Sequence, residues 1–339
     1  MRILYLECNA GASGDMILGA LSEILDEGEA GRVLSSIGVP ETSYSFGKGE
    51  RGRIRGTKAT VLVHGMEEHE PHQHQHHHRS LPEVLEIIRN LNVSENVKEH
   101  ATAIYSIIAS AEAEAHGVPV GEVHFHEVGM LDAIADVVGA CALIERLSPD
   151  RIESSPLRTG HGYVQCAHGS LPVPAPATAI VLKRIPTYAG DVEGEFTTPT
   201  GAAIVKHFAE EYGPRPQMAV NGIGCGLGGR ESAIPNVLRA FIGDSKNAMP
   251  AVKVLSCNID DMTAEDLGAA IPALMADGAL DAFVVPAIMK KGRPGHVLTC
   301  ICRSKDADVV AGSMLRNTST IGIRVTDADR YEMTSRFEV

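Results

Sequence analysis

The chain has 339 residues, of which 44% are hydrophobic, and this length favours two domains with a buried core each. Acidic residues outnumber basic ones by 43 to 30, aromatic residues make up 4%, and tryptophan is absent. We therefore do not expect a nucleic-acid partner. A protein that binds nucleic acid needs a basic surface, and one that binds single strands also needs aromatic rings on which bases stack.

The seven cysteines fit neither a disulfide framework nor a four-cysteine zinc site, since their number is odd and no two are spaced as CxxC. We therefore expect a reducing, cytoplasmic location. The opening run MRILYLE is much shorter than the core of a signal peptide. No apolar run approaches the length needed to cross a membrane, so a membrane partner is not expected.

The chain begins with the pattern of an α/β unit. Residues 2–7 predict a buried strand, residues 8–14 (CNAGASG) a loop of small residues, and residues 15–25 an amphipathic helix. Ser13 and Gly14 lie where this helix begins, so backbone N–H groups and the helix dipole suit a phosphate group. The loop lacks the lysine of a P-loop, and Ser13 as a simple N-cap is an equal alternative.

Residues 57–64 predict the next strand, and a histidine-rich stretch follows it. Residues 64–80 contain seven histidines and almost no apolar side chain, which predicts a mobile loop. Neutral imidazole binds nickel, copper and zinc, so we expect this loop to collect metal ions. It is not expected to catalyse, because catalysis needs rigid ligands. The candidate ligands are His72, His74, His76, His77 and His78.

The rest of the N-terminal part alternates helical patterns with turn residues. Helices are predicted at 81–91, 95–116, 131–147 and 201–212, a short strand or turn at 124–129, and a closing strand at 235–243.

The segment HFHEVGMLDAIAD, residues 124–136, concentrates metal-binding side chains. His124 and His126 share one face of a strand, and Asp132 and Asp136 share one face of the following helix. We predict that these four residues bind nickel, since dense buried carboxylates are costly without a cation. The alternative is that Asp132 and Glu127 cap the helix and His124 belongs to the core.

Three glycine-rich stretches follow: GHGYVQCAHG (160–169), EFTTPTG (195–201) and GIGCGLGG (222–229). Glycine permits close approach of the backbone to a ligand, and their number predicts a pocket built from loops. His161 and His168 are flanked by glycine and are candidate ligands or general acids. Ordinary turn chemistry explains each stretch taken alone.

The pattern resets at residue 251, after the linker-like stretch 243–250, so we expect domains at 1–246 and 251–339. The predicted order in the second domain is β-α-β-β-α-β, which is the ferredoxin-like arrangement. The fold class is therefore α/β (α+β), with an α/β domain followed by a ferredoxin-like domain.

Two features of the second domain together predict a metal–triphosphate site. Asp260 and Asp261 follow a strand, and carboxylate oxygen suits Mg²⁺ or Mn²⁺. The loop MKKGRPG, 289–295, and a later strand supply cations that suit phosphate groups, namely Lys290, Lys291, Arg293 and Arg324. The alternatives are an ordinary helix cap at the aspartates and a solvated basic surface.

Ten segments carry a family resemblance and run in order through nearly the whole chain. They are GASGDM (11–16), the histidine stretch (64–80), HFHEVG with its two aspartates (124–136), HGSLPVPAPAT (168–178), TPTGAA (198–203), PNVLR (235–239), NIDDMTAE (258–265), GALDAF (278–283), MKKGRPG (289–295) and TIGIRV (320–325). On these segments the chain resembles the LarC family, the nickel insertion proteins of nickel-pincer nucleotide cofactor biosynthesis.

The resemblance implies a CTP-dependent cyclometallase, a nickel chelatase of the lyase class. Such an enzyme inserts Ni²⁺ into pyridinium-3,5-bisthiocarboxylic acid mononucleotide, forming nickel–sulfur and nickel–carbon bonds while CTP becomes CMP and pyrophosphate. The product serves lactate racemase-type enzymes, so the apo form of such an enzyme is an expected partner, and a homo-oligomer is expected. The family's C-terminal domain is the one associated with CTP and Mn²⁺.

Two departures from the family pattern stand out. Asn317 occupies a position that is usually acidic in the family, and the family's final segment is expected to be missing after Val339.

Nickel–carbon bond formation requires loss of a ring proton, for which His161 or His168 is the candidate base. Two other functions compete with this one: a non-catalytic nickel store or chaperone, and a metal-dependent phosphohydrolase.

Overall fold

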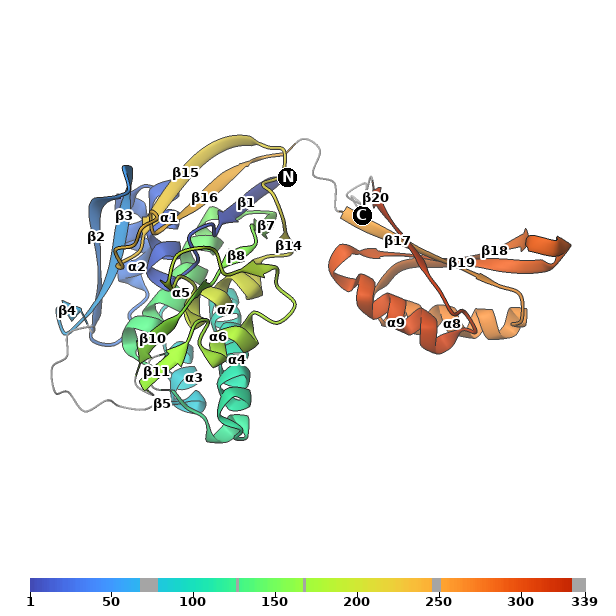
Figure 1. The fold of residues 1–339 in the computed structure, drawn as a ribbon, viewed down its shortest axis with the longest axis horizontal. Helices are drawn as coiled ribbons and strands as arrows, with labels where there is room; N and C mark the ends of the chain where they lie inside the picture. Colours follow the sequence, from blue (N-terminus) through green and yellow to red (C-terminus); the bar gives the residue numbers. More distant parts are fainter. Residues whose placement is uncertain (68–78, 126–127, 167–168, 246–250, 331–339) are drawn as a thin grey trace, which may run out of the picture. The chain divides into compact units, whose positions relative to one another are not determined.

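The computed structural model describes residues 1–67, 79–125, 128–166, 169–245 and 251–330. The chain divides into two compact units, Met1–Lys246 and Asn247–Val339, each with its own helices and sheet (Figure 1). The mixture of helix and strand confirms the predicted α/β (α+β) class.

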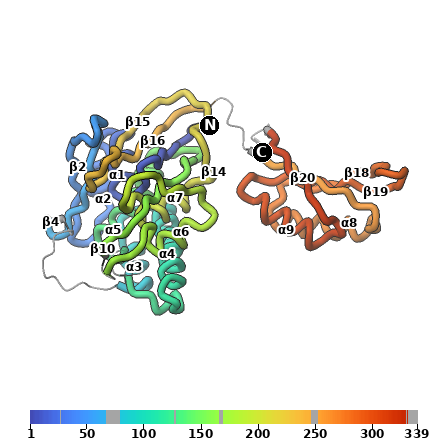
Figure 2. The backbone as a smooth tube through the Cα atoms, viewed as in Figure 1, coloured from blue at the N-terminus to red at the C-terminus, as the bar shows by residue number. Residues whose placement is uncertain are grey.

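The first unit is built on one mixed sheet. Its strands in spatial order are β14 (Glu211–Tyr212), β7 (Arg151–Ser154), β1 (Arg2–Glu7), β16 (Val237–Asp244), β15 (Ala219–Leu227), β3 (Ile54–Val63) and β2 (Thr42–Arg51), with β4 (Met66–Glu67) paired to β3. β1 pairs in parallel with β7 and antiparallel with β16, so the first strand of the chain is central in the sheet. The backbone trace shows β15 and β16 side by side (Figure 2).

Seven helices accompany this sheet within the described part of the first unit. They are α1 (Gly14–Leu25), α2 (Glu27–Ser36), α3 (Leu81–Arg89), α4 (Glu95–His116), α5 (Leu131–Leu147), α6 (Pro176–Val181) and α7 (Pro199–Phe208). α1 lies on β3, β15 and β16, while α4 packs against α5, α6 and α7. Helix α1 therefore lies between much of the sheet and the other helices, while α5 also reaches β3 and β2 and α7 reaches β7.

The glycines of β15 allow α1 to lie directly on the sheet. A Cβ atom on Gly224 or on Gly226 would sit 1.8 Å from the carbonyl oxygen of Ala20 or Met16, respectively. The prediction of a ligand-binding loop at 222–229 is therefore wrong over 222–227. These residues form a strand, and their glycines are required by helix packing.

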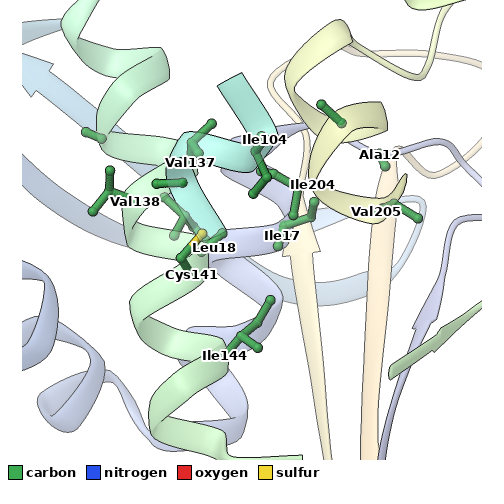
Figure 3. Close-up of a cluster of buried hydrophobic side chains, with 14 of the residues drawn as sticks. Ala12, Ile17, Leu18, Ile104, Val137, Val138, Cys141, Ile144, Ile204 and Val205 are labelled. Carbon is green, nitrogen blue, oxygen red and sulfur yellow. The ribbon is translucent and has the colours of Figure 1, made fainter. Parts of the chain in front are cut away.

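The core of the first unit lies between the helices and the sheet. Figure 3 shows side chains from α1, α4, α5 and α7 meeting in one cluster. Ile17, Ile104, Val137 and Ile204 have no exposed surface at all. Burial of such side chains provides the main stabilisation of this unit, at about 1.5–3 kcal/mol each.

Among the described residues, four pairs of short strands lie outside the main sheet. They are β5 (Arg79–Ser80) with β6 (His124–Phe125), β8 (Leu157–Arg158) with β12 (Thr187–Tyr188), β9 (Gly160–His161) with β13 (Gly194–Glu195), and β10 (Tyr163–Cys166) with β11 (Gly169–Pro172). β4 and β5 occupy the two ends of the histidine-rich stretch that was predicted as a loop throughout. Residues 68–78, between them, lie outside the described residues.

The second unit has the order β17 (Ala251–Ile259), α8 (Ala264–Ala276), β18 (Ala279–Ile288), β19 (Pro294–Arg303), α9 (Ala307–Asn317) and β20 (Arg324–Asp329). Its antiparallel sheet has the spatial order β18-β19-β17-β20, which confirms the predicted ferredoxin-like arrangement. A separate core fills the space under the two helices, with Leu255, Cys300, Val310 and Met314 fully buried.

Within the described residues, no helix combines the length and the apolar character that crossing a membrane requires.

Candidate functional site

The loop between β1 and α1 is enclosed by segments that are distant in sequence. A Cβ atom on Gly11, which has a φ of +85°, would lie 1.9 Å from the carbonyl oxygen of Phe196. A Cβ atom on Gly201 would lie 2.1 Å from the carbonyl oxygen of Ala12. The structure thus brings together two of the predicted segments, the small-residue loop 8–14 and the glycine-rich stretch 195–201, and their glycines make these contacts possible.

The first turn of α7 begins at this same loop. Thr198 is the N-cap of α7; its side-chain oxygen accepts from the N–H of Gly201 at 3.2 Å, and its own N–H donates to Ala12 at 3.0 Å. Ser13 is the N-cap of α1. Two helix N-termini therefore meet at one loop, and the dipole at a helix N-terminus favours a negatively charged ligand.

Ser13 and Gly14 make contacts that the sequence did not predict. The Ser13 hydroxyl donates to the carboxylate of Asp15 and accepts no bond from a helix N–H. Gly14 leaves room for Asp136, since a Cβ atom there would lie 2.3 Å from the Oδ2 atom of that aspartate. The start of α1 therefore lies directly against a carboxyl group of α5.

Three carboxyl groups gather at this point. Burial raises the pKa of Asp136 well above its usual range, and the nearby charges of Asp15 and Asp132 raise it further. Asp132 also accepts from the N–H of Ala133 at 2.7 Å. A raised pKa means that the ionised form is disfavoured as the site stands, and a bound cation would remove that penalty.

The segment that leads into α5 is held by two long side chains. Buried Tyr105 donates to the carbonyl oxygen of Val128 at 3.0 Å, and Arg79 donates to that of Gly129 at 2.9 Å. Burial, and then the charges of Asp132 and Asp136, raise the pKa of Tyr105. These anchors fix the position of α5 and of its carboxyl groups.

His124 lies on β6, with an exposed side chain, and pairs with Ser80. It is close to Glu83, whose pKa is lowered mainly by hydrogen bonds from Ser80 and slightly by His124. His126 lies outside the described residues. Across the described ranges, no three His, Cys, Asp or Glu side chains are arranged as a metal centre, so the four-residue nickel site stays a prediction.

The two candidate bases are placed unequally. His161 is exposed on β9, pairs with Gly194 of β13, and lies near Asp191. The other candidate base, His168, lies outside the described residues, as do the candidate tract ligands His72, His74, His76, His77 and His78.

Cys8, at the start of the β1–α1 loop, is fully buried, and burial raises the pKa of its thiol to about 12. It therefore remains a neutral thiol at neutral pH.

In the second unit, the predicted acidic and basic residues lie near one another. The guanidinium of Arg293 is 3.7 Å from a carboxylate oxygen of Asp260, and both side chains are largely exposed. Asp261 accepts from the hydroxyl of Ser319. Arg324 donates to the side chain of Asn258 at 2.6 Å, just before the two aspartates.

A cavity of about 470 Å³ adjoins this group, between the end of β17 and the β18–β19 hairpin. Its lining includes Asp260, Met262, Ile288 and His296. Lys290 and Lys291 lie at the tip of the same hairpin and are exposed. Sequence reasoning did not single out Met262 or His296, although Met262 lies within NIDDMTAE (258–265) and His296 directly follows MKKGRPG (289–295).

Comparison with known proteins decides the family. The chain matches the family described as nickel insertion protein over residues 4–339. It belongs to that family. The resemblance to LarC found in the sequence is thereby confirmed.

Two named relatives match this chain over most of their length. One is the pyridinium-3,5-bisthiocarboxylic acid mononucleotide nickel insertion protein of Staphylococcus saprophyticus, 40% identical over 99% of this chain and 84% of that protein. Another, of the same name, from Geobacillus kaustophilus, is 40% identical over 96% of this chain and 82% of that protein. A solved structure of LarC2, the C-terminal domain of a cyclometallase involved in the synthesis of the NPN cofactor of lactate racemase, is 38% identical. It covers 24% of this chain and 56% of that chain, with a TM-score of 0.23.

Proposed function

We propose that this chain inserts nickel into pyridinium-3,5-bisthiocarboxylic acid mononucleotide in a reaction that consumes CTP. The observation that carries the proposal is the family match, which runs through both units. The relatives named for this substrate share about two fifths of their residues with this chain.

The first unit is assigned nickel and the precursor. His124, His126, Asp132 and Asp136 are the proposed nickel ligands, and the geometry at the start of α1 adds Asp15 beside them. The adjacent helix N-termini suit the anionic groups of the precursor. The histidines of 72–78 are proposed to deliver nickel to this site.

Bond formation between nickel and a ring carbon releases a proton, so a base must stand at the ring. His161 or His168 is proposed for this role, since an imidazole side chain can act as a proton acceptor near physiological pH. The nickel ion is the substrate here, and the carboxylates of α1 and α5 would hold it while the proton leaves.

The second unit is assigned CTP with Mn²⁺ or Mg²⁺. Asp260 and Asp261 offer hard oxygen ligands for such an ion. Lys290, Lys291, Arg293 and Arg324 would neutralise the triphosphate, and the closeness of Arg293 to Asp260 supports this arrangement. A cytoplasmic homo-oligomer that serves an apo enzyme of the lactate racemase type completes the proposal.

The test is product formation by the full chain. Protein, Ni²⁺ and precursor are incubated with each nucleoside triphosphate in turn, and nickelated product is measured by mass spectrometry. We expect product with CTP and Mn²⁺. Bound nickel without turnover would instead identify a store or chaperone, and CTP cleavage that ignores the precursor would identify a phosphohydrolase.

A further inference from the structure

Arg158, at the end of β8, is a buried cation beside the β1–α1 loop. Only 8% of the residue is exposed, its N–H donates to the carbonyl oxygen of Cys8 at 3.3 Å, and its carbonyl oxygen accepts from Thr197 at 2.7 Å. Its guanidinium carbon lies 5.3 Å from the ring centre of Phe196. The backbone and the ring thus hold this cation in a fixed place.

The guanidinium is only half satisfied along one edge. Its Nη2 atom donates to Asp191 at 2.7 Å, whereas its neighbouring Nε is buried and has no hydrogen-bond partner. Nε and Nη2 form the fork that binds both oxygens of a carboxylate or phosphate. An unpaired buried donor is costly, so this edge has unused capacity for an oxyanion.

The counterion of Arg158 is poorly suited to a purely structural role. The side chain of Asp191 is 90% exposed, so water screens its attraction to the buried guanidinium and weakens the contribution of the pair to stability. Gly190, with a φ of +76°, precedes it and lies against the guanidinium, where a Cβ atom would be 2.4 Å from the central carbon. A glycine at this position tolerates the positive φ and the close approach to the guanidinium that bring Asp191 to Arg158.

The surroundings of Arg158 belong to the candidate site. Tyr188, paired through β12 with β8, donates its hydroxyl to the carbonyl oxygen of Asn9 in the β1–α1 loop at 3.2 Å. His161, a candidate base, lies near Asp191. An oxyanion on the guanidinium would therefore be bound next to the loop at which α1 and α7 begin.

We propose that Arg158 binds an oxyanion of the precursor through Nε and Nη2, and that Asp191 occupies part of that position until the substrate displaces it. The inference rests on the proposed function and adds the residue that would position the substrate. The precursor carries two kinds of oxyanion, the phosphate and the thiocarboxylates, and both have the chemistry that this fork recognises.

The test measures equilibrium binding of the precursor to the full chain by calorimetry, without nickel or CTP. Arg158→Gln is expected to weaken binding about ten-fold or more, since two charge-assisted hydrogen bonds are lost. Arg158→Lys keeps the charge and loses the fork, so it is expected to fall between Arg158→Gln and the wild type.

Asp191→Asn gives the decisive sign. Removing a competing carboxylate should tighten precursor binding by about two- to five-fold, which corresponds to the strength of an exposed ion pair. Asp191 is exposed, so this variant keeps the test valid even if Arg158→Gln fails to fold. If Asp191→Asn binds the precursor as tightly as the wild type or more weakly, the inference is overturned. The proposed function, nickel insertion, is not contradicted by that result.

Two further arms complete the design. The dephosphorylated nucleoside of the precursor identifies the group: if it retains the Arg158 dependence, the fork binds a thiocarboxylate, and if it loses it, the fork binds the phosphate. If Arg158→Gln changes the binding of neither the precursor nor its nucleoside, the inference is overturned. A wild-type chain that binds no precursor at all overturns both the inference and the proposed function.

Discussion

The carboxyl group of Asp136 is held where its ionised form is disfavoured. Its pKa lies well above the ordinary value of 3.8 because of burial and the charges of Asp15 and Asp132. A group whose folded-state pKa is raised contributes stability at low pH and loses it as the pH rises. At neutral pH this carboxyl group therefore opposes folding unless a cation is bound, which is common at functional sites.

We expect Asp136→Asn to raise the melting temperature of the metal-free protein and to lower its affinity for Ni²⁺. The stability gain over the wild type should grow as the pH rises above about 4, because the wild-type group then faces ionisation. Thermal unfolding at several pH values and nickel titration measure both effects. Asp281→Asn, a change at an exposed aspartate, is the control and should alter neither.

A pair of histidines between α4 and α7 predicts a pH dependence of the opposite sign. His100 Nδ1 and His207 Nε2 are 2.8 Å apart, and burial, followed by the charge of His100, lowers the pKa of His207 from 6.5 to about 4. The neutral form is thus favoured in the folded state. Stability associated with this pair is fully present above pH 6.5 and is lost as the pH falls towards 4.

The free energy of unfolding falls between those pH values, and this fall should be about 1–2 kcal/mol smaller in His207→Gln than in the wild type, after allowance for partial exposure. Urea unfolding at pH 7 and pH 4.5 measures the difference. Other groups titrate in this range, so the prediction concerns the difference between variant and wild type. An equal loss of stability in both proteins would contradict it.

At the scale of whole elements, the contact between α1 and β15 is the tightest test of packing. Gly226→Ala would place a methyl carbon 1.8 Å from the carbonyl oxygen of Met16, and neither backbone can move freely. We expect a loss of about 3 kcal/mol or more in the free energy of unfolding. Gly229→Ala is the matched control, because a Cβ atom there meets nothing within 4 Å.

The histidine-rich segment makes a separate prediction. Deleting residues 68–78 should lower the number of Ni²⁺ ions bound per chain and leave the melting temperature nearly unchanged, since these residues have almost no apolar side chains. Nickel binding by calorimetry and thermal unfolding measure the two quantities. Unchanged nickel stoichiometry would remove the metal-collecting role, and a large fall in melting temperature would show that the segment supports the fold.

The elements that the sequence predicted are those with strong periodicity. The long helices α4 and α5 and the whole ferredoxin-like order follow from apolar spacing and turn residues. Strand β2, TSYSFGKGER, was missed because it lies at the sheet edge and exposes most of its side chains. Residues 222–227 were misread as a loop because the reason for their glycines, the backbone of α1, is distant in sequence.

The candidate site likewise contains residues that the sequence predicted and residues that it did not. Asp132 and Asp136 were found from their four-residue spacing on one helix, and the structure adds Asp15 through the contact of Gly14 with Asp136. Arg158 was not identified, because a single arginine in a short strand carries no pattern. Its significance comes from an unpaired Nε and an exposed partner, and neither is visible in a sequence.

At the scale of the whole molecule, two units with separate cores allow separate functions. Arg293→Ala in the full chain should weaken CTP binding, measured with Mn²⁺ present, about ten-fold or more, since a charge-assisted phosphate contact contributes about 1.5–3 kcal/mol. Precursor binding should not change. Lys305→Ala, an exposed cation outside the β18–β19 hairpin, is the control. Equal CTP affinities in all three proteins would favour a nickel chaperone.

Because β1 is central in the sheet, it is synthesised long before one of the strands that pair with it. Its antiparallel partner β16 comes last in the first unit, and Glu7 meets Arg239 across 232 residues. At about 5–20 residues per second, a ribosome needs roughly 12–46 seconds to make that stretch. Throughout this interval the apolar strand RILYLE has an unpaired edge, which is the kind of surface that chaperones cover in nascent chains. The histidines of the tract are synthesised early in the same interval, before the segment 195–201 that encloses the loop between β1 and α1.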